Sequence, residues 1–197
     1  MKFREYGQEL ALEQWGQIIG KSSDELGPLA GFLKNFPDAK AKQQILDEVS
    51  SEEQSLIKQQ QPLPGTEVLI SKAHQSGVKL GIVSSSNQDW VHQHLRRLEL
   101  LDYFDHTSCA DEVEKAKPDP ALYHLGLEKM GLEPDRVVVL EDSPHGVLAA
   151  KRAGLYCIAV PNQLTRQLTF FTDGGAPDLF LKSLEEFPWD DLMRAEA

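Results

Sequence analysis

The chain has 197 residues, with 20 lysines and arginines against 31 aspartates and glutamates, which gives a formal net charge of -11. An acidic protein repels nucleic acid and anionic membranes, so neither is expected as a partner. Hydrophobic residues make up 41% of the chain, which is typical of a globular protein. The length is enough for one domain and a small companion domain.

No targeting segment is expected at the N-terminus, because no apolar core follows the basic residues of MKFREYGQEL. The longest apolar run, residues 155–160, is far shorter than the ~20 residues that cross a bilayer. The two cysteines, Cys109 and Cys157, lack metal-ligand spacing and fit a reducing compartment. We therefore expect a cytoplasmic protein.

The first part of the chain carries only helical patterns. Apolar residues recur with helical spacing up to Phe36, and a further helix is expected from Asp38 to about Gln60. The string QQQPLPG at residues 59–65 then breaks the pattern and indicates a hinge. The sequence predicts a helical domain over residues 1–61 and a second domain over residues 62–197.

Beyond the hinge, strands alternate with helices. This pattern is typical of an α/β fold, with a Rossmann-like parallel sheet covered by helices on both faces. Ligands of such sheets bind at the carboxyl ends of the strands. The expected elements are helix 67–75, strand 79–84, helix 89–98, strand 106–109, helix 121–131, strand 136–141, helix 144–154 and strand 155–160.

Polar clusters stand near these strand ends. Residues 84–87 (SSSN) follow LGIV, Lys117 precedes a proline, and Glu141 with Asp142 follows VVVL. Each has an ordinary explanation, as a helix cap or a solvated lysine, but adjacent carboxylates repel each other and need a reason. Together they form a coherent site, because hydroxyl and N–H groups bind phosphate, lysine adds positive charge and the acidic pair suits Mg²⁺.

The strings LGIVSSSN, VEKAKPDPALY and VVVLEDSPHGVLAAKRAG resemble, in this order, the second, third and fourth motifs of the haloacid dehalogenase (HAD) superfamily. The similarity runs through nearly the whole chain and is closest to the beta-phosphoglucomutase-like phosphatases, whose cap domain the N-terminal helices resemble. The resemblance implies a Mg²⁺-dependent phosphatase of a small phosphorylated metabolite such as a sugar phosphate.

The resemblance also implies roles for individual residues. Ser84 would bind the transferring phosphoryl group with help from the N–H of Ser85, and Asn87 would belong to the same substrate-binding loop. Lys117 would pair with the phosphoryl oxygens and with the nucleophilic carboxylate. Asp142 would ligate Mg²⁺, with Glu141 at or next to the metal, so that the cation offsets the repulsion within the pair.

The family's first motif, D-x-D after an apolar strand, is not found in the sequence. Its first aspartate is the nucleophile that forms an aspartyl-phosphate, and its second is the general acid and base. The strings FDHTS and PWDDL do not match it. We therefore expect the nucleophile to lie outside this chain, and residues 1–197 alone to be inactive. Because the motif's strand is central in the family's sheet, a gap is expected between LGIVS and VVVLE.

Other interpretations stay open. Ser23 stands where the mutases of the subgroup carry an arginine that grips a second phosphate, which favours hydrolysis over a sugar-phosphate mutase. A signalling receiver domain has its acidic pair before its hydroxyl and lysine, whereas here the pair comes last. A non-catalytic protein that keeps the fold and binds a metal or a partner would explain the missing nucleophile, but not the retained Ser84, Lys117 and acidic pair. The sequence does not determine the oligomeric state.

Overall fold

The structure is a computed structural model, and it divides the chain into two compact units, one of residues 1–18 and 23–61 and one of residues 19–22 and 62–197. The predicted helical faces before residue 31 and the specificity position Ser23 fall almost wholly outside the described residues. The assignment of the first unit as a cap domain stays a prediction. The structure describes residues 5, 11, 14, 16, 19, 31–36, 38–170 and 174–194.

Helix α4 (Ala39–Gln59) is the main described element of the first unit. Asp38 caps its N-terminus. The side chain of Asp38 accepts a hydrogen bond from the N–H of Ala41 at 2.7 Å and so satisfies one unpaired amide of the first turn. Ile45 is 3% exposed and packs with Phe32 and Leu33, while the remainder of the helix is mostly polar. The predicted helix from Asp38 to about Gln60 is confirmed.

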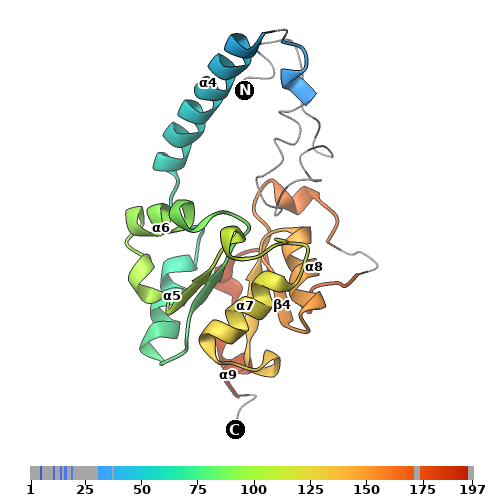
Figure 1. Ribbon diagram of the computed structural model, residues 1–197. Coiled ribbons are helices and arrows are strands. Elements are labelled where there is room, and N and C mark those ends of the chain that lie inside the picture. Colours follow the sequence, from blue (N-terminus) through green and yellow to red (C-terminus); the bar gives the residue numbers. More distant parts are fainter. Residues whose placement is uncertain are drawn as a thin grey trace. The chain divides into compact units, whose positions relative to one another are not determined.

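Between residues 66 and 159 the second unit alternates strands and helices as the sequence predicts, with each boundary within a few residues of the expected one, whereas the strand Leu179–Phe180 and the helix Trp189–Arg194 are not among the predicted elements (Figure 1). None of the described helices is both long and apolar enough to cross a membrane. The elements are α5 (Thr66–Gln75), β1 (Gly81–Val83), α6 (Gln88–Arg97), β2 (His106–Ser108), α7 (Ala121–Met130), β3 (Val138–Glu141), α8 (Pro144–Arg152), β4 (Tyr156–Ala159), β5 (Leu179–Phe180) and α9 (Trp189–Arg194), with short 3₁₀ turns at Leu101–Tyr103, Ala110–Glu112, Pro134–Arg136, Thr165–Gln167 and Leu184–Glu186.

The strands pair in parallel, but over the described residues they form two sheets instead of one. Strand β1 pairs with β2, and Ile82 is opposite Thr107. Strand β4 lies between β3 and β5, and Glu141 is opposite Ala159. Within the described strands, β1 and β3 are therefore each paired on one edge only.

The larger sheet packs against apolar side chains on both faces, as is typical of parallel sheets, although Val138 and Leu140 of β3 stay partly exposed. On one face, Val139, Cys157 and Ala159 join the apolar side of α8 in a core that also includes Tyr123 and Phe170. Ile158 and Val160 point to the opposite face. There they pack with a group from the C-terminal part of the chain, namely Leu179, Leu181, Leu184, Phe187 and Leu192.

A cavity of about 420 Å³ separates the two sheets. We call it the slot, and its walls include β1 on one side and β3 on the other, with residues of α5 and α7 around them. Val138 and Leu140 of β3 line it and are 37% and 39% exposed. The slot lies where the sequence predicts a gap between the LGIVS and VVVLE strands.

Candidate active site

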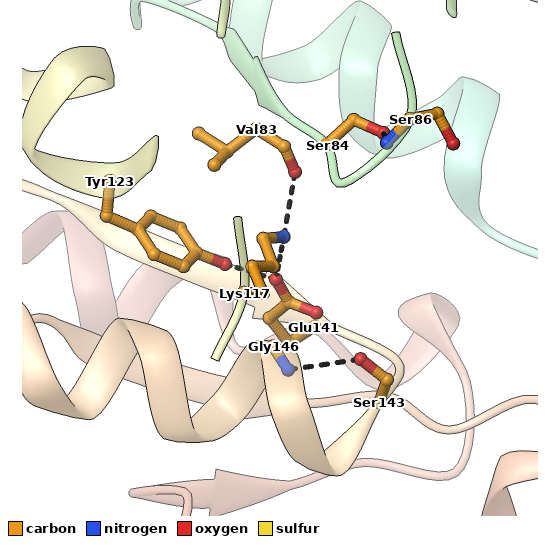
Figure 2. Close-up of polar contacts among 8 residues, drawn as sticks. All are labelled: Val83, Ser84, Ser86, Lys117, Tyr123, Glu141, Ser143 and Gly146. Carbon is orange, nitrogen blue, oxygen red and sulfur yellow. Dashed lines mark hydrogen bonds and ion pairs between the residues drawn. The ribbon is translucent and has the colours of Figure 1, made fainter. Parts of the chain in front are cut away.

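Lys117 joins the carboxyl ends of β1 and β3. Its Nζ donates to the carbonyl oxygen of Val83 at 2.8 Å and to Oε1 of Glu141 at 2.5 Å (Figure 2). Lys117 is 7% exposed and Glu141 is 8% exposed, so both charges are buried and each is compensated by the other. The peptide bond that follows, Lys117–Pro118, is cis.

Glu141 has a second partner in Tyr123 of α7, whose hydroxyl donates to the same Oε1 atom (Figure 2). Burial, and next the negative charge of Glu141, raise the pKa of Tyr123 well above its usual value, which keeps the phenol protonated and able to donate. The α8 backbone approaches from the other side. A Cβ at Gly146 would lie 1.8 Å from Oε2 of Glu141, so only glycine fits there.

The two adjacent carboxylates have different surroundings. Glu141 is buried against Lys117 and Tyr123, whereas Asp142 is exposed at the end of the strand. Asp142 does not cap the following helix, because Ser143 does so by accepting the N–H of Gly146 at 3.1 Å (Figure 2). A buried cation thus compensates one carboxylate, and the other stays available to a ligand.

The loop after β1, residues 84–87 (SSSN), is held in shape by hydrogen bonds within the protein. The N–H of Ser84 donates to Ser108 of β2 at 2.9 Å, which extends the ladder by one residue. Oγ of Ser84 accepts the N–H of Ser86 at 3.1 Å, so the hydroxyl proton can be donated to an anionic oxygen. Asn87 caps α6 by accepting the N–H of Trp90 at 2.9 Å.

These residues surround a polar pocket of about 360 Å³ at the carboxyl ends of β1 and β3. It brings together Ser84, Ser85, Lys117, Glu141 and Asp142, five of the six predicted site residues. The sixth, Asn87, is outside the lining and acts as a helix cap, so its contact with substrate stays a prediction. The lining residues are Val83, Ser84, Ser85, Ser86, Lys117, Leu140, Glu141, Asp142 and Ser143.

A comparison with known protein families shows which family the chain belongs to. The family model for haloacid dehalogenase-like hydrolases matches residues 2–160. The chain belongs to this family. The predicted membership of the HAD superfamily, the α/β fold and the assignment as a hydrolase of this family are confirmed.

Relatives and solved structures support the same placement. The candidate phosphatase YhcW of Bacillus subtilis is 36% identical over 177 residues, which cover 85% of this chain and 76% of YhcW. The phosphorylated carbohydrates phosphatase of Thermotoga maritima is 41% identical over 92 residues, 47% of this chain and 43% of that protein. CbbY from Rhodobacter sphaeroides, solved in complex with phosphate, has a TM-score of 0.73 at 26% identity and covers 94% of this chain and 85% of its own.

The residues of the pocket fit Mg²⁺ only in part. No group of three or more His, Cys, Asp or Glu side chains is placed to hold a metal within the described residues. Asp142 offers one open carboxylate, which suits Mg²⁺ because this ion keeps several waters and often binds one or two carboxylates plus a phosphate. Oε1 of Glu141 already accepts from Lys117 and Tyr123, so a direct bond from Glu141 to a metal stays a prediction.

The charge of Asp142 depends on these neighbours. Desolvation, and next the charge of Glu141, raise the pKa of Asp142 above its usual value, although Lys117 and the side-chain amide of Asn162 act in the opposite direction. A bound cation would also favour the ionised carboxylate. Sequence reasoning missed both Tyr123 and Asn162. A tyrosine on an apolar helix and an asparagine after a proline have no pattern that marks them as site residues.

Proposed function

We propose that this protein is a Mg²⁺-dependent phosphatase of a small phosphorylated metabolite such as a sugar phosphate. The observation that carries the proposal is the position of Lys117, a buried cation in a polar pocket at the carboxyl ends of β1 and β3. Such a group can donate to a phosphoryl oxygen and, together with a cation held by Asp142, would offset the negative charge of a phosphoryl group, which the acidic protein as a whole would repel. CbbY has been solved with phosphate and, as a mutant, with xylulose-(1,5)bisphosphate, which supports this class of substrate.

In this proposal each pocket residue contributes to phosphoryl binding, either directly or by holding Lys117 or the metal. Lys117 has three N–H donors, of which Val83 and Glu141 take two, so one remains for a phosphoryl oxygen. Ser84 donates its hydroxyl proton to a second oxygen. Asp142 would hold Mg²⁺, which when bound supplies further positive charge to the phosphoryl oxygens. Glu141 fixes Lys117 in place.

We further propose that a β-strand of apolar residues ending in aspartate occupies the slot and brings the nucleophile of an aspartyl-phosphate mechanism. Ser84 and Glu141 direct their backbone groups to β2 and to β4. Successive residues of a strand alternate in this direction, so the backbone groups of Val83 and Leu140 face the slot. The carbonyl oxygen of Val83 accepts from Lys117 Nζ, and a strand parallel to both would pair with the remaining groups and end beside Lys117.

The test compares residues 1–197 with fusions that add one apolar strand, D-x-D and a short linker upstream of Met1. A matched control carries N-x-N in place of D-x-D. We expect the D-x-D fusion to release phosphate from an aryl phosphate and from a hexose 1-phosphate in a Mg²⁺-dependent manner. The N-x-N fusion should be equally soluble but inactive, and residues 1–197 alone should be inactive and less soluble.

The assay also separates the alternatives. Conversion of the hexose 1-phosphate to the 6-phosphate as main product would identify a mutase. Equal turnover by the two fusions, or robust turnover by residues 1–197 alone, would contradict the proposed nucleophile. A soluble D-x-D fusion without any turnover would favour the non-catalytic interpretation.

A further inference from the structure

Asn162 reaches the candidate site from the neighbouring strand. Strand β4 runs parallel to β3, and the N–H of Val160 donates to the carbonyl oxygen of Glu141 at 2.7 Å, one residue beyond the strand. This pairing brings the turn after β4 beside Asp142. There Nδ2 of Asn162 donates to Oδ2 of Asp142 at 3.0 Å.

The other polar groups of Asn162 close the turn in which it lies. Its Oδ1 accepts the N–H groups of Leu164 at 2.9 Å and Thr165 at 3.0 Å. Its own N–H donates to Oγ1 of Thr165 at 3.0 Å, and its carbonyl oxygen accepts the N–H of Arg166 at 3.0 Å. Because Oδ1 faces two N–H donors, the orientation of the amide is determined, and Nδ2 must point toward Asp142.

The turn is anchored in the protein interior. Thr165 is 1% exposed and shares two hydrogen bonds with Asn162, so the turn cannot shift without disturbing the protein interior. Asp142, in contrast, is an exposed side chain. Without Asn162 its carboxylate could adopt several rotamers, and a cation would have to select one of them at an entropic cost.

We propose that Asn162 is a positioning residue, which holds the carboxylate of Asp142 in the orientation that binds a divalent cation in the pocket. The inference rests on the proposed role of Asp142 as a metal ligand. Asn162 itself touches neither metal nor substrate. Groups that orient a ligand in this way typically contribute about 10–100-fold to metal affinity.

The decisive variant is Asn162→Ser. A serine hydroxyl can still accept backbone N–H groups of the turn, but it is too short to reach Asp142. The probe is Mn²⁺, an oxygen-binding substitute for Mg²⁺, and its binding to residues 1–197 is measured by the relaxation enhancement of water protons. We expect Asn162→Ser to bind Mn²⁺ about tenfold more weakly, with an unchanged urea midpoint. Gln163→Ser, an exposed neighbour in the same turn, should bind like the wild type.

A double-mutant cycle with Asp142→Asn distinguishes positioning from a general structural role. If Asn162 acts through Asp142, Asn162→Ser should cause no further loss of Mn²⁺ affinity in the Asp142→Asn background. An equal loss in both backgrounds, or wild-type affinity of Asn162→Ser beside a weakened Asp142→Asn, would overturn the inference and leave the proposed function intact. Wild-type Mn²⁺ affinity of Asp142→Asn would overturn the metal role of Asp142 itself.

Discussion

Strands β3 and β4 are neighbours in one sheet and begin with equally exposed side chains, Val138 at 37% and Tyr156 at 40%, but the facing pair Leu140 and Ile158 is buried to very different extents. In β4, which has a partner on each edge, Cys157, Ile158 and Ala159 are all 0% exposed. In β3, which is paired with β4 alone, Leu140 is 39% exposed although it is directly opposite Ile158.

The comparison shows what a second neighbour contributes to a parallel strand. Leu140 and Ile158 are both aliphatic, so residue type does not explain the difference. The slot beside β3 does, because the side chains that would cover Leu140 are absent from the described residues there. At the end of this edge, Lys117 connects β3 to β1 through its contacts with Val83 and Glu141. The site is therefore built around a polar bridge between the two sheets.

The largest effect is expected from breaking this bridge. Glu141→Gln keeps the shape of the side chain but leaves the buried ammonium group of Lys117 without a counter-charge, which should lower the free energy of unfolding by about 3–5 kcal/mol. Urea unfolding followed by circular dichroism would measure it. Asp142→Asn, one residue further and exposed, is the matched control and should cost less than about 1 kcal/mol. Equal losses would show that Glu141 and Lys117 are not a buried pair.

A second pair of variants tests the two strands directly. Ile158→Ala removes a fully buried side chain of β4 and should cost about 3 kcal/mol, because a cavity remains in the core. Leu140→Ala, at the opposing position of β3, should cost at most about 1 kcal/mol, since its side chain is already partly in water. Urea midpoints would compare the two. If a fused strand fills the slot, the cost of Leu140→Ala should rise toward that of Ile158→Ala.

A third variant, Gly146→Ala, tests how tightly α8 fits Glu141. Alanine normally stabilises a helix relative to glycine, but here its Cβ would overlap Oε2 of Glu141, which Lys117 and Tyr123 hold in place. We expect a loss of about 2 kcal/mol in unfolding free energy. At Gly31 a Cβ would meet nothing within 4 Å, so Gly31→Ala is the control and should be neutral or stabilising. A stabilised Gly146→Ala would contradict the described contact.

The smallest effect concerns the far edge of β4, where Asp178 accepts from Lys151 Nζ at 2.6 Å and from the N–H of Cys157 at 2.7 Å. Burial raises the pKa of Asp178, but the Lys151 and Cys157 contacts outweigh it and lower the pKa overall. The ionised carboxylate is thus favoured by folding. Its stabilisation is complete above the unfolded pKa of about 3.9 and is lost as the pH falls through the lower folded value.

Asp178→Asn should therefore cost about 1 kcal/mol at neutral pH. The difference from the wild type should shrink as the pH is lowered from about 5 to about 3. Urea midpoints over this range would measure it, with the exposed Asp102→Asn as control. A difference that stays constant with pH would show that Asp178 acts by packing and not by its charge.

Much of this protein was determined by local sequence. The order of strands and helices in residues 62–160, the polar clusters at strand ends and the family resemblance all follow from short-range patterns, because periodicity, caps and prolines act over a few residues. Helix α4 begins where Asp38 predicts it, and α8 begins at Pro144, directly after its cap Ser143. The gap between the LGIVS and VVVLE strands also follows from the sequence, since the motif that would fill it is not found there.

The tertiary structure decides which polar residues at the strand ends are buried and paired and which stay open to a ligand. Glu141 and Asp142 are adjacent and chemically alike, yet one is buried beside Lys117 while the other is exposed, and only the packing of α7 and α8 around β3 separates them. The contacts of Tyr123 with Glu141 and of Asn162 with Asp142 join residues 18 and 20 positions apart. Contacts of this kind depend on how strands and helices pack in three dimensions, so no local pattern in the sequence encodes them.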